Sequence, residues 1–159
     1  DKEHPVFPRP DALLSKTPLL LGTDGNKMSK SRGNTIELDM TADETARVLK
    51  KAKTDPDRVI TYDPENRPEV SNLLMMASLA TGEDPHAIAD RIGDGGGGTL
   101  KSVVTDALNE FLAPIRERRE ELAANEDYLL EVLHHGDEVA NEQADRTLAE
   151  VRRAMDMVY

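Results

Sequence analysis

The sequence has no cysteine and no tryptophan, and only 2 phenylalanines and 3 tyrosines among its 159 residues. Without cysteine, the chain can form neither a disulfide nor a thiolate metal site. With so few aromatic rings, a hydrophobic core has to be built mainly from aliphatic side chains. The length corresponds to one domain, or to one domain and part of another.

Long apolar runs are also missing from the sequence. No run approaches the roughly 20 residues that a membrane-spanning helix requires. The chain opens on Asp-Lys-Glu-His-Pro, which shows no sign of a secretory signal peptide. We therefore expect a cytoplasmic protein that has no membrane partner.

Basic residues are fewer than acidic residues, and the formal net charge is -11. This acidity argues against a surface that coats nucleic acid broadly, so any contact with RNA has to be local. Two arginine groups are candidates for such contacts, although their acidic neighbours favour the alternative that they are solvated helix faces. The candidates are Arg116, Arg118, Arg119, Arg146, Arg152 and Arg153.

The start of the chain is predicted to be extended. Three prolines between Pro5 and Pro10 exclude a helix or a central strand, so residues 1–18 should form a loop. The short apolar run Leu19–Leu21 then predicts a buried strand. Because the chain starts with aspartate in a segment typical of mid-loop sequence, we expect a fragment whose N-terminal part is missing.

From residue 41 onward, the pattern predicts helices. Thr41 and Glu44 have the spacing of a capping box. Pro68 fits the first turn of a second helix, and Asp84 fits the N-cap of a third. Pro114 lies inside the longest apolar stripe, where we expect a kink or break. The predicted helices cover about residues 42–53, 68–82, 85–93, 99–124, 125–133 and 137–157, with Gly136 separating the last two.

The predicted fold is therefore mainly α, with a compact helical unit over residues 39–159 and the end of a strand-containing part over residues 1–38. The glycine run over 93–98 formally matches G-x-G-x-x-G, but a dinucleotide loop follows a strand and this run follows a predicted helix. A P-loop needs its lysine directly after the last glycine, whereas Thr99 and Leu100 intervene here. We interpret the run as a flexible connection between two helices.

No metal site is predicted. His134 and His135 are adjacent, and on a helix they would point about 100° apart, so they cannot both ligate one ion. His4 and His86 have no histidine or carboxylate at ligand spacing.

The loop over residues 22–34 is the stretch best suited to chemistry, because it carries Lys27-Met28-Ser29-Lys30-Ser31 after two glycines. Lysine brings a compact positive charge, hydroxyls add short hydrogen bonds, and glycine lets the backbone approach a ligand. We interpret the stretch as a mobile loop that binds a polyphosphate. The alternative is an ordinary exposed loop that happens to contain lysine and serine.

The string Lys27–Ser31 matches the KMSKS loop of class I aminoacyl-tRNA synthetases, which closes on ATP. Arg32-Gly33-Asn34 extends a match that is shared with methionyl, cysteinyl and branched-chain members. Downstream, a P-x-x-S-N-L-L helix and a long helix with an internal proline resemble bacterial tryptophanyl-tRNA synthetases. The stretches that carry this resemblance, to the C-terminal half of that family, are Ala52–Asp55, Ile60–Pro64, Arg67–Leu74, Lys101 and Leu112–Arg118.

The resemblance implies that residues 1–38 are the last strand and KMSKS loop of a Rossmann-like nucleotide-binding domain, and residues 39–159 a helical anticodon-side domain. It implies a ligase of protein biosynthesis that activates tryptophan with ATP, transfers it to its tRNA, and is a homodimer at full length. Mg would be carried by the nucleotide. The HIGH-type motif and the tryptophan pocket belong to the family's N-terminal half, so we expect the fragment alone to be inactive.

The resemblance also assigns roles within the loop. Lys30 is the first candidate for stabilising charge on the leaving pyrophosphate, and Lys27 the second. Ser29 and Ser31 would bond phosphate oxygens or hold the closed loop, and Met28 would pack at the adenine side. The backbone of residues Pro18–Leu21 would form one edge of the adenine site.

Two alternatives remain open on the sequence. The first is another synthetase with the same loop, methionyl or cysteinyl. The second is a stand-alone helical module that binds RNA or protein and retains the loop without its activity.

Overall fold

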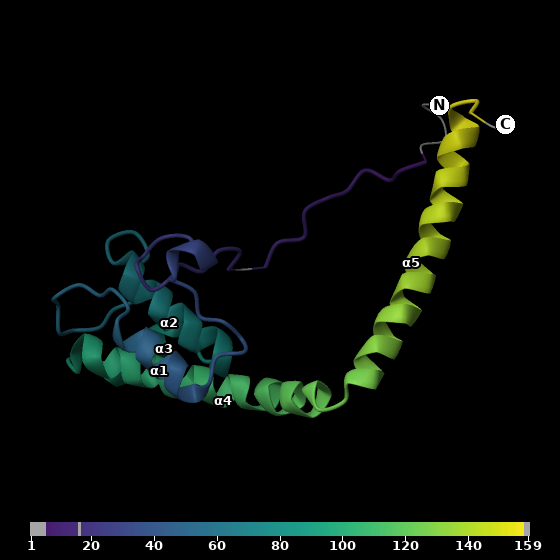
Figure 1. The fold of residues 1–159 in the computed structure, drawn as a ribbon. Coiled ribbons are helices and arrows are strands. Elements are labelled where there is room, and N and C mark those ends of the chain that lie inside the picture. Colours follow the sequence, from purple (N-terminus) through teal and green to yellow (C-terminus); the bar gives the residue numbers. More distant parts are fainter. Residues whose placement is uncertain (1–5, 16, 158–159) are drawn as a thin grey trace. The chain divides into compact units, whose positions relative to one another are not determined.

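The structure is a computed structural model, and it describes residues 6–15 and 17–157 (Figure 1). Contacts divide the chain into two units, one of residues Lys16–Arg119 and one of Asp1–Ser15 with Glu120–Tyr159. The unit Lys16–Arg119 contains the loop over residues 22–34 together with the helical residues up to Arg119, and the predicted domain boundary between residues 38 and 39 stays a prediction. The elements are η1 (Lys30–Arg32), α1 (Ala42–Lys50), α2 (Pro68–Thr81), α3 (Pro85–Ile92), α4 (Gly96–Ala123) and α5 (Glu126–Ala154).

The mainly helical fold is confirmed, and the described residues contain no β-strand. The strand expected at Leu19–Leu21 is reduced to one β-bridge between Leu21 and Lys27, and Leu19 is 56% exposed. A strand needs a neighbour to complete its hydrogen bonds, and no described strand supplies one. The predicted loop at the start is extended over its described residues, while residues 1–5, with His4, lie outside the description.

Helix α1 begins at the predicted capping box. The Glu44 amide donates to Thr41 Oγ1 at 3.2 Å, and the Thr41 amide donates to the Glu44 carboxylate at 2.9 Å. The helix ends at Lys50, three residues before the predicted Lys53. The reason is local, because the Lys53 amide donates to the Thr23 carbonyl at 2.7 Å and so cannot continue the helix.

Helices α2 and α3 form as their end signals predict. Pro68 occupies the first turn of α2, which ends at Gly82 with a left-handed φ of 77°. Asp84 caps α3 by accepting from the His86 amide at 2.9 Å. Gly93 follows the last residue of α3.

The unit Lys16–Arg119 has an aliphatic core, as the scarcity of aromatic residues predicts. The most deeply buried side chains come from all four of its long helices, and each contributes about 1.5–3 kcal/mol by leaving water. They include Leu49, Val70, Leu74, Ile88, Leu100 and Val104.

The glycine run belongs partly to a helix, so its interpretation as a flexible connection was wrong for Gly96–Gly98. These glycines form the first turn of α4, and the Gly96 amide donates to the Arg58 carbonyl at 2.9 Å. A Cβ on Gly97 would lie 2.9 Å from Thr54 Oγ1. The missing side chains therefore let the start of α4 pack against the loop that follows α1.

Helix α4 continues through Pro114 to Ala123, so the helix is not broken there, and the kink that we expected as the other outcome stays a prediction. Proline removes one backbone hydrogen bond of a helix. The turns before and after Pro114 keep α4 continuous.

Residues 126–154 form the single helix α5, where we expected two helices separated at Gly136. Asn125 caps it, because its side chain accepts from the Tyr128 amide at 3.2 Å. Glycine inside a helix costs about 0.5–1 kcal/mol, which is too little to end one of this length. None of its described residues is buried. Within the described ranges, no helix combines the length and apolar character that crossing a membrane requires.

Candidate functional site

The lysine loop consists of a bridged turn followed by one short helical turn. The bridge pairs Leu21 with Lys27, and η1 begins three residues after Lys27. Gly33 follows the last residue of η1, and its φ of 64° lies in the left-handed region that glycine adopts without strain.

Asn34 closes the loop and is buried, with 3% of its surface exposed. Its Oδ1 accepts from the Ser29 amide at 2.8 Å. Its Nδ2 donates to Asp24 Oδ1 at 2.7 Å and to the Lys27 carbonyl at 3.2 Å. The bond from Asn34, with a second from the Asn26 amide, lowers the pKa of the Asp24 carboxyl. One neutral amide thus connects three parts of the loop.

The two lysines and Ser31 of the loop are exposed, and Ser29 is half-buried. Lys27 is exposed, and the Lys30 side chain is 85% exposed with its Nζ 3.8 Å from a Glu37 carboxylate oxygen. Ser29 Oγ and Ser31 Oγ lie 2.8 Å apart and share a hydrogen bond. An exposed ion pair of this kind contributes little to stability, so a phosphate can replace Glu37 at low cost.

Met28, between the lysines, packs partly buried against the helical core. Pro18 and Leu19 line a cleft of about 270 Å³ together with Tyr62 and Met75. The cleft lies beside the loop in sequence and in space, because Leu21 forms part of both.

Asn72 of α2 holds the extended segment that leads into the loop. Its Oδ1 accepts from the Leu21 amide at 2.8 Å, and its Nδ2 donates to the Leu21 carbonyl at 3.0 Å. These two bonds imitate the pair that a residue in a neighbouring strand would make. The adjacent Ser71 accepts from the Asp63 amide at 2.8 Å. The Ser-Asn pair of the P-x-x-S-N-L-L helix therefore holds two separate loops.

Lys53 makes a closer ion pair than the one between Lys30 and Glu37. Its Nζ lies 2.6 Å from Glu69 Oε1. The hydrogen bond to Glu69 raises the pKa of Lys53, and the same bond lowers the pKa of Glu69. The Glu69 side chain also lies against Gly25, where a Cβ would be 3.0 Å from its Cγ. This pair therefore supports the turn of the lysine loop.

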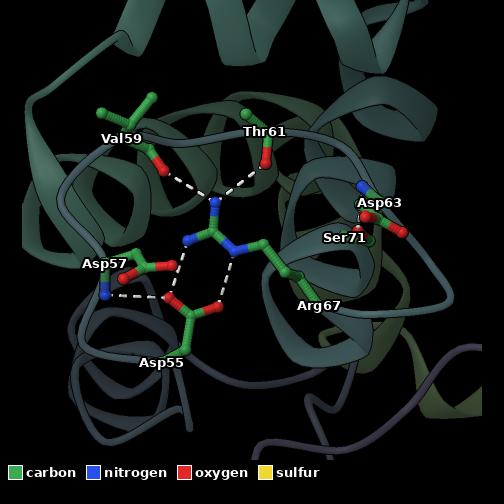
Figure 2. Close-up of polar contacts among 7 residues, drawn as sticks. All are labelled: Asp55, Asp57, Val59, Thr61, Asp63, Arg67 and Ser71. Atoms are coloured by element: carbon green, nitrogen blue, oxygen red, sulfur yellow. Dashed lines mark hydrogen bonds and ion pairs between the residues drawn. The ribbon is translucent and has the colours of Figure 1, made fainter.

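Arg67 organises the second polar loop, residues 54–67 (Figure 2). Its Nε and Nη2 donate to the two carboxylate oxygens of Asp55 at 2.8 and 2.6 Å. Its Nη1 donates to the Val59 carbonyl at 2.7 Å and to Thr61 Oγ1 at 2.9 Å. Its side chain is 13% exposed. The hydrogen bond from Arg67 lowers the pKa of Asp55, and the same bond raises the pKa of Arg67.

The arginine candidates have different surroundings. Arg116 joins α4 to α1, because its Nη1 donates to Asn109 Oδ1 and its Nη2 to Thr45 Oγ1, both at 3.0 Å. Arg146 donates to Gln143 Oε1 at 2.9 Å. All the candidates except Arg116 are exposed, namely Arg118, Arg119, Arg146, Arg152 and Arg153. An RNA contact by any of the six stays a prediction.

The roles of Asn34, Asn72 and Arg67 were not predicted from the sequence. Each sits inside a stretch that carries the family resemblance. The residue types alone gave a hint of these roles, because asparagine and arginine side chains each carry several hydrogen-bond donors that a folded loop can use. Their partners could not be read from the sequence, because the contacts of Asn72 reach 51 residues along the chain.

The part of the chain that holds the lysine loop and the helices up to residue 113 matches one known family of proteins. A model of the family described as tRNA synthetases class I (W and Y) matches residues 1–113. The chain therefore belongs to the class I tRNA synthetases of this family, which confirms the family predicted from the KMSKS string and the helices after it.

The curated relatives that match most of this chain are tryptophan–tRNA ligases. The tryptophan–tRNA ligase of Aquifex aeolicus is 38% identical over 157 residues, which cover 96% of this chain and 39% of the relative. The tryptophan–tRNA ligase of Nostoc is 36% identical over 160 residues, covering 97% and 48%. The solved tryptophanyl-tRNA synthetase of Campylobacter jejuni, complexed with ADP and tryptophan, matches with a TM-score of 0.70 and 25% identity, covering 95% and 48%. The chain thus spans less than half the length of these relatives.

Proposed function

We propose that this chain is the KMSKS-loop and helical portion of a tryptophan–tRNA ligase. The full enzyme would condense tryptophan with ATP to give tryptophanyl-adenylate and pyrophosphate, and would then transfer the tryptophanyl group to its tRNA. The observation that carries the proposal is the lysine loop itself. Its two lysines are exposed while its backbone is held by buried Asn34.

The residues of the lysine loop fit a nucleoside triphosphate. Attack at the α-phosphate needs little covalent help, so charge stabilisation and positioning dominate such a step. Lys30, and secondly Lys27, would neutralise charge on the leaving pyrophosphate. Ser29 and Ser31 would exchange their mutual hydrogen bond for phosphate oxygens. Mg would enter with the nucleotide.

The adenine side is proposed at the cleft that Pro18 and Leu19 line. Met28 would act on the adenine side indirectly. It packs against the helical core and lines a pocket together with Leu20, so it fixes the middle of the Lys27–Ser31 string. The cleft and the lysines flank the same bridged turn, which is the arrangement that a ligand with a ring at one end and phosphates at the other requires.

The choice of tryptophan is supported by the relatives, since the KMSKS string itself is shared with methionyl and cysteinyl enzymes. Five exposed arginines are the proposed candidates for tRNA phosphates, namely Arg118, Arg119, Arg146, Arg152 and Arg153. Arg116 is a weaker candidate, because its guanidinium already binds Thr45 and Asn109. A homodimer at full length and a cytoplasmic location belong to the same proposal.

ATP–pyrophosphate exchange tests the proposal. The full-length protein that carries this chain is assayed with tryptophan, tyrosine, methionine and cysteine in parallel, and only tryptophan should support exchange. Exchange with another of these amino acids would replace tryptophan in the proposal. Failure with every amino acid, together with a native mass near 17.6 kDa, would favour the stand-alone helical module instead.

A further inference from the structure

Asn34 contacts the peptide groups on both sides of Met28. Its Nδ2 donates to the Lys27 carbonyl, which precedes Met28, and its Oδ1 accepts from the Ser29 amide, which follows it. Asn34 itself is 3% exposed, whereas the lysines on either side of these peptides are at the surface. The backbone from which both lysines project is therefore fixed from inside the loop.

We propose that Asn34 is a positioning residue that sets the directions of Lys27 and Lys30 toward the phosphates. This inference rests on the proposed function. Asn34 does not touch the ligand in it, because its amide is fully used by Ser29, Asp24 and Lys27. Its effect would be to keep the two ammonium groups in one arrangement, so that little ordering remains when ATP binds.

The position requires an amide rather than a carboxylate. The nitrogen of Asn34 faces two acceptors, the Asp24 carboxylate and the Lys27 carbonyl. An aspartate of the same shape would place a second negative oxygen against Asp24 and leave the Lys27 carbonyl without its donor. Both changes are unfavourable in a buried site.

Gly22 completes the arrangement from the other side. A Cβ at this position would lie 2.5 Å from Asn34 Nδ2 and 2.6 Å from its carbonyl oxygen. The Asn34 carbonyl also accepts from the Thr23 amide at 3.0 Å. Glycine at position 22 is thus required for Asn34 to be buried where its amide reaches the loop.

The test compares Asn34→Asp and Asn34→Ala with the parent in the full-length protein. Both variants should lower kcat of tryptophan-dependent pyrophosphate exchange at least 10-fold, with an unchanged KM for tryptophan. Adding Asp24→Asn to Asn34→Asp should recover part of the loss, because an amide then faces a carboxylate again with the roles reversed. The matched control is Asn141→Asp on the exposed face of α5, which makes the same chemical change without an effect on exchange.

A second readout does not depend on catalysis. Trypsin cleaves after lysine and arginine, so cleavage at Lys27, Lys30 and Arg32 reports the order of the loop, with Arg146 on α5 as internal reference. In Asn34→Asp, loop cleavage relative to Arg146 should rise several-fold while the helical circular dichroism is retained. Normal exchange kinetics in Asn34→Asp would overturn the proposal, and so would unchanged loop cleavage. Loss of exchange in the parent protein would instead overturn the proposed function, and the cleavage assay would still decide whether Asn34 orders the loop.

Discussion

Two polar loops of the unit Lys16–Arg119 are each organised by one side chain, but the chemistry of that side chain differs. In the lysine loop the organiser is neutral Asn34, and the positive charges of Lys27 and Lys30 remain at the surface. In the loop over 54–67 the organiser is Arg67, whose charge is neutralised by Asp55. The first arrangement leaves cations available to a ligand, and the second uses its cation for structure.

The difference has a physical basis. A neutral amide orders a backbone without adding a field that would compete with a bound phosphate. A bidentate guanidinium–carboxylate pair orders a backbone more strongly, but it presents almost no net charge to a partner. The comparison therefore separates a loop whose cations stay at the surface, where we propose that they bind phosphates, from a loop whose cation is neutralised by a carboxylate.

The largest effect is expected at Lys30. In the full-length protein, Lys30→Ala should lower the rate of adenylate formation about 10²–10³-fold, the cost of losing one preorganised transition-state donor. Tryptophan affinity should change little, because Lys30 is proposed to act on pyrophosphate. Lys51→Ala, which removes an exposed lysine next to α1, is the control. An unchanged exchange rate in Lys30→Ala would remove the distinction between the two loops.

Arg67→Ala should destabilise the fold by about 1.5–3 kcal/mol, the range for losing hydrogen bonds to a charged group. Arg67→Lys should fall between Ala and the parent, because an ammonium keeps the charge but cannot bond both Asp55 oxygens and two further acceptors in one plane. Urea unfolding followed by circular dichroism measures both variants. If Arg67→Lys were as stable as the parent, charge alone would explain the second loop.

The Asp55–Arg67 pair also predicts a pH dependence. The folded pKa of Asp55 lies below its ordinary value of 3.8, so the stabilisation is fully present above that value and is lost as pH falls through the folded pKa. Asp55→Asn should therefore be less stable than the parent at neutral pH, with the gap closing in strong acid. Urea midpoints measured across this range provide the test, and a gap that stayed constant would show that ionisation of Asp55 contributes nothing.

The smallest effect on stability is expected at Gly97 and Gly98 in the first turn of α4, which lies against the loop over residues 54–67. Gly98→Ala should stabilise α4 by about 0.5–1 kcal/mol, since a helix prefers alanine and its Cβ would meet no atom within 4 Å. Gly97→Ala should gain less or lose stability, because its Cβ would lie 2.9 Å from Thr54 Oγ1. Thermal unfolding of the two matched variants compares them. Equal stabilisation would show that the loop moves freely away from α4.

Local signals in the sequence predicted most of the fold. The Thr41–Glu44 capping box and the Asp84 N-cap depend on neighbours two or three residues away, so the starts of α1 and α3 were predicted correctly. Gly136 and Gly96–Gly98 misled because glycine weakens a helix without by itself ending one: α5 continues through Gly136, and α4 begins at Gly96. The roles of Asn34, Asn72 and Arg67 depend on backbone atoms that only the folded chain brings near them.

The candidate site likewise has one part that the sequence predicted and one part that it could not predict. The lysine string was identified from residue type and spacing, because exposed cations in a glycine-containing loop are a local pattern. What holds that string in place could not be predicted, since it depends on a buried amide and on the space left by Gly22. The sequence thus indicated the groups that would meet a ligand, and the structure supplied the groups that orient them.

The paired bonds between Asn72 and Leu21 have a consequence for protein engineering. The five residues of the KMSKS string contain neither the amide that orders them nor the helix that anchors the segment before them. A graft of the string alone into another scaffold would transfer its charges without their arrangement. The smallest portable unit is residues 21–34 together with one helix that presents an asparagine to the backbone of residue 21.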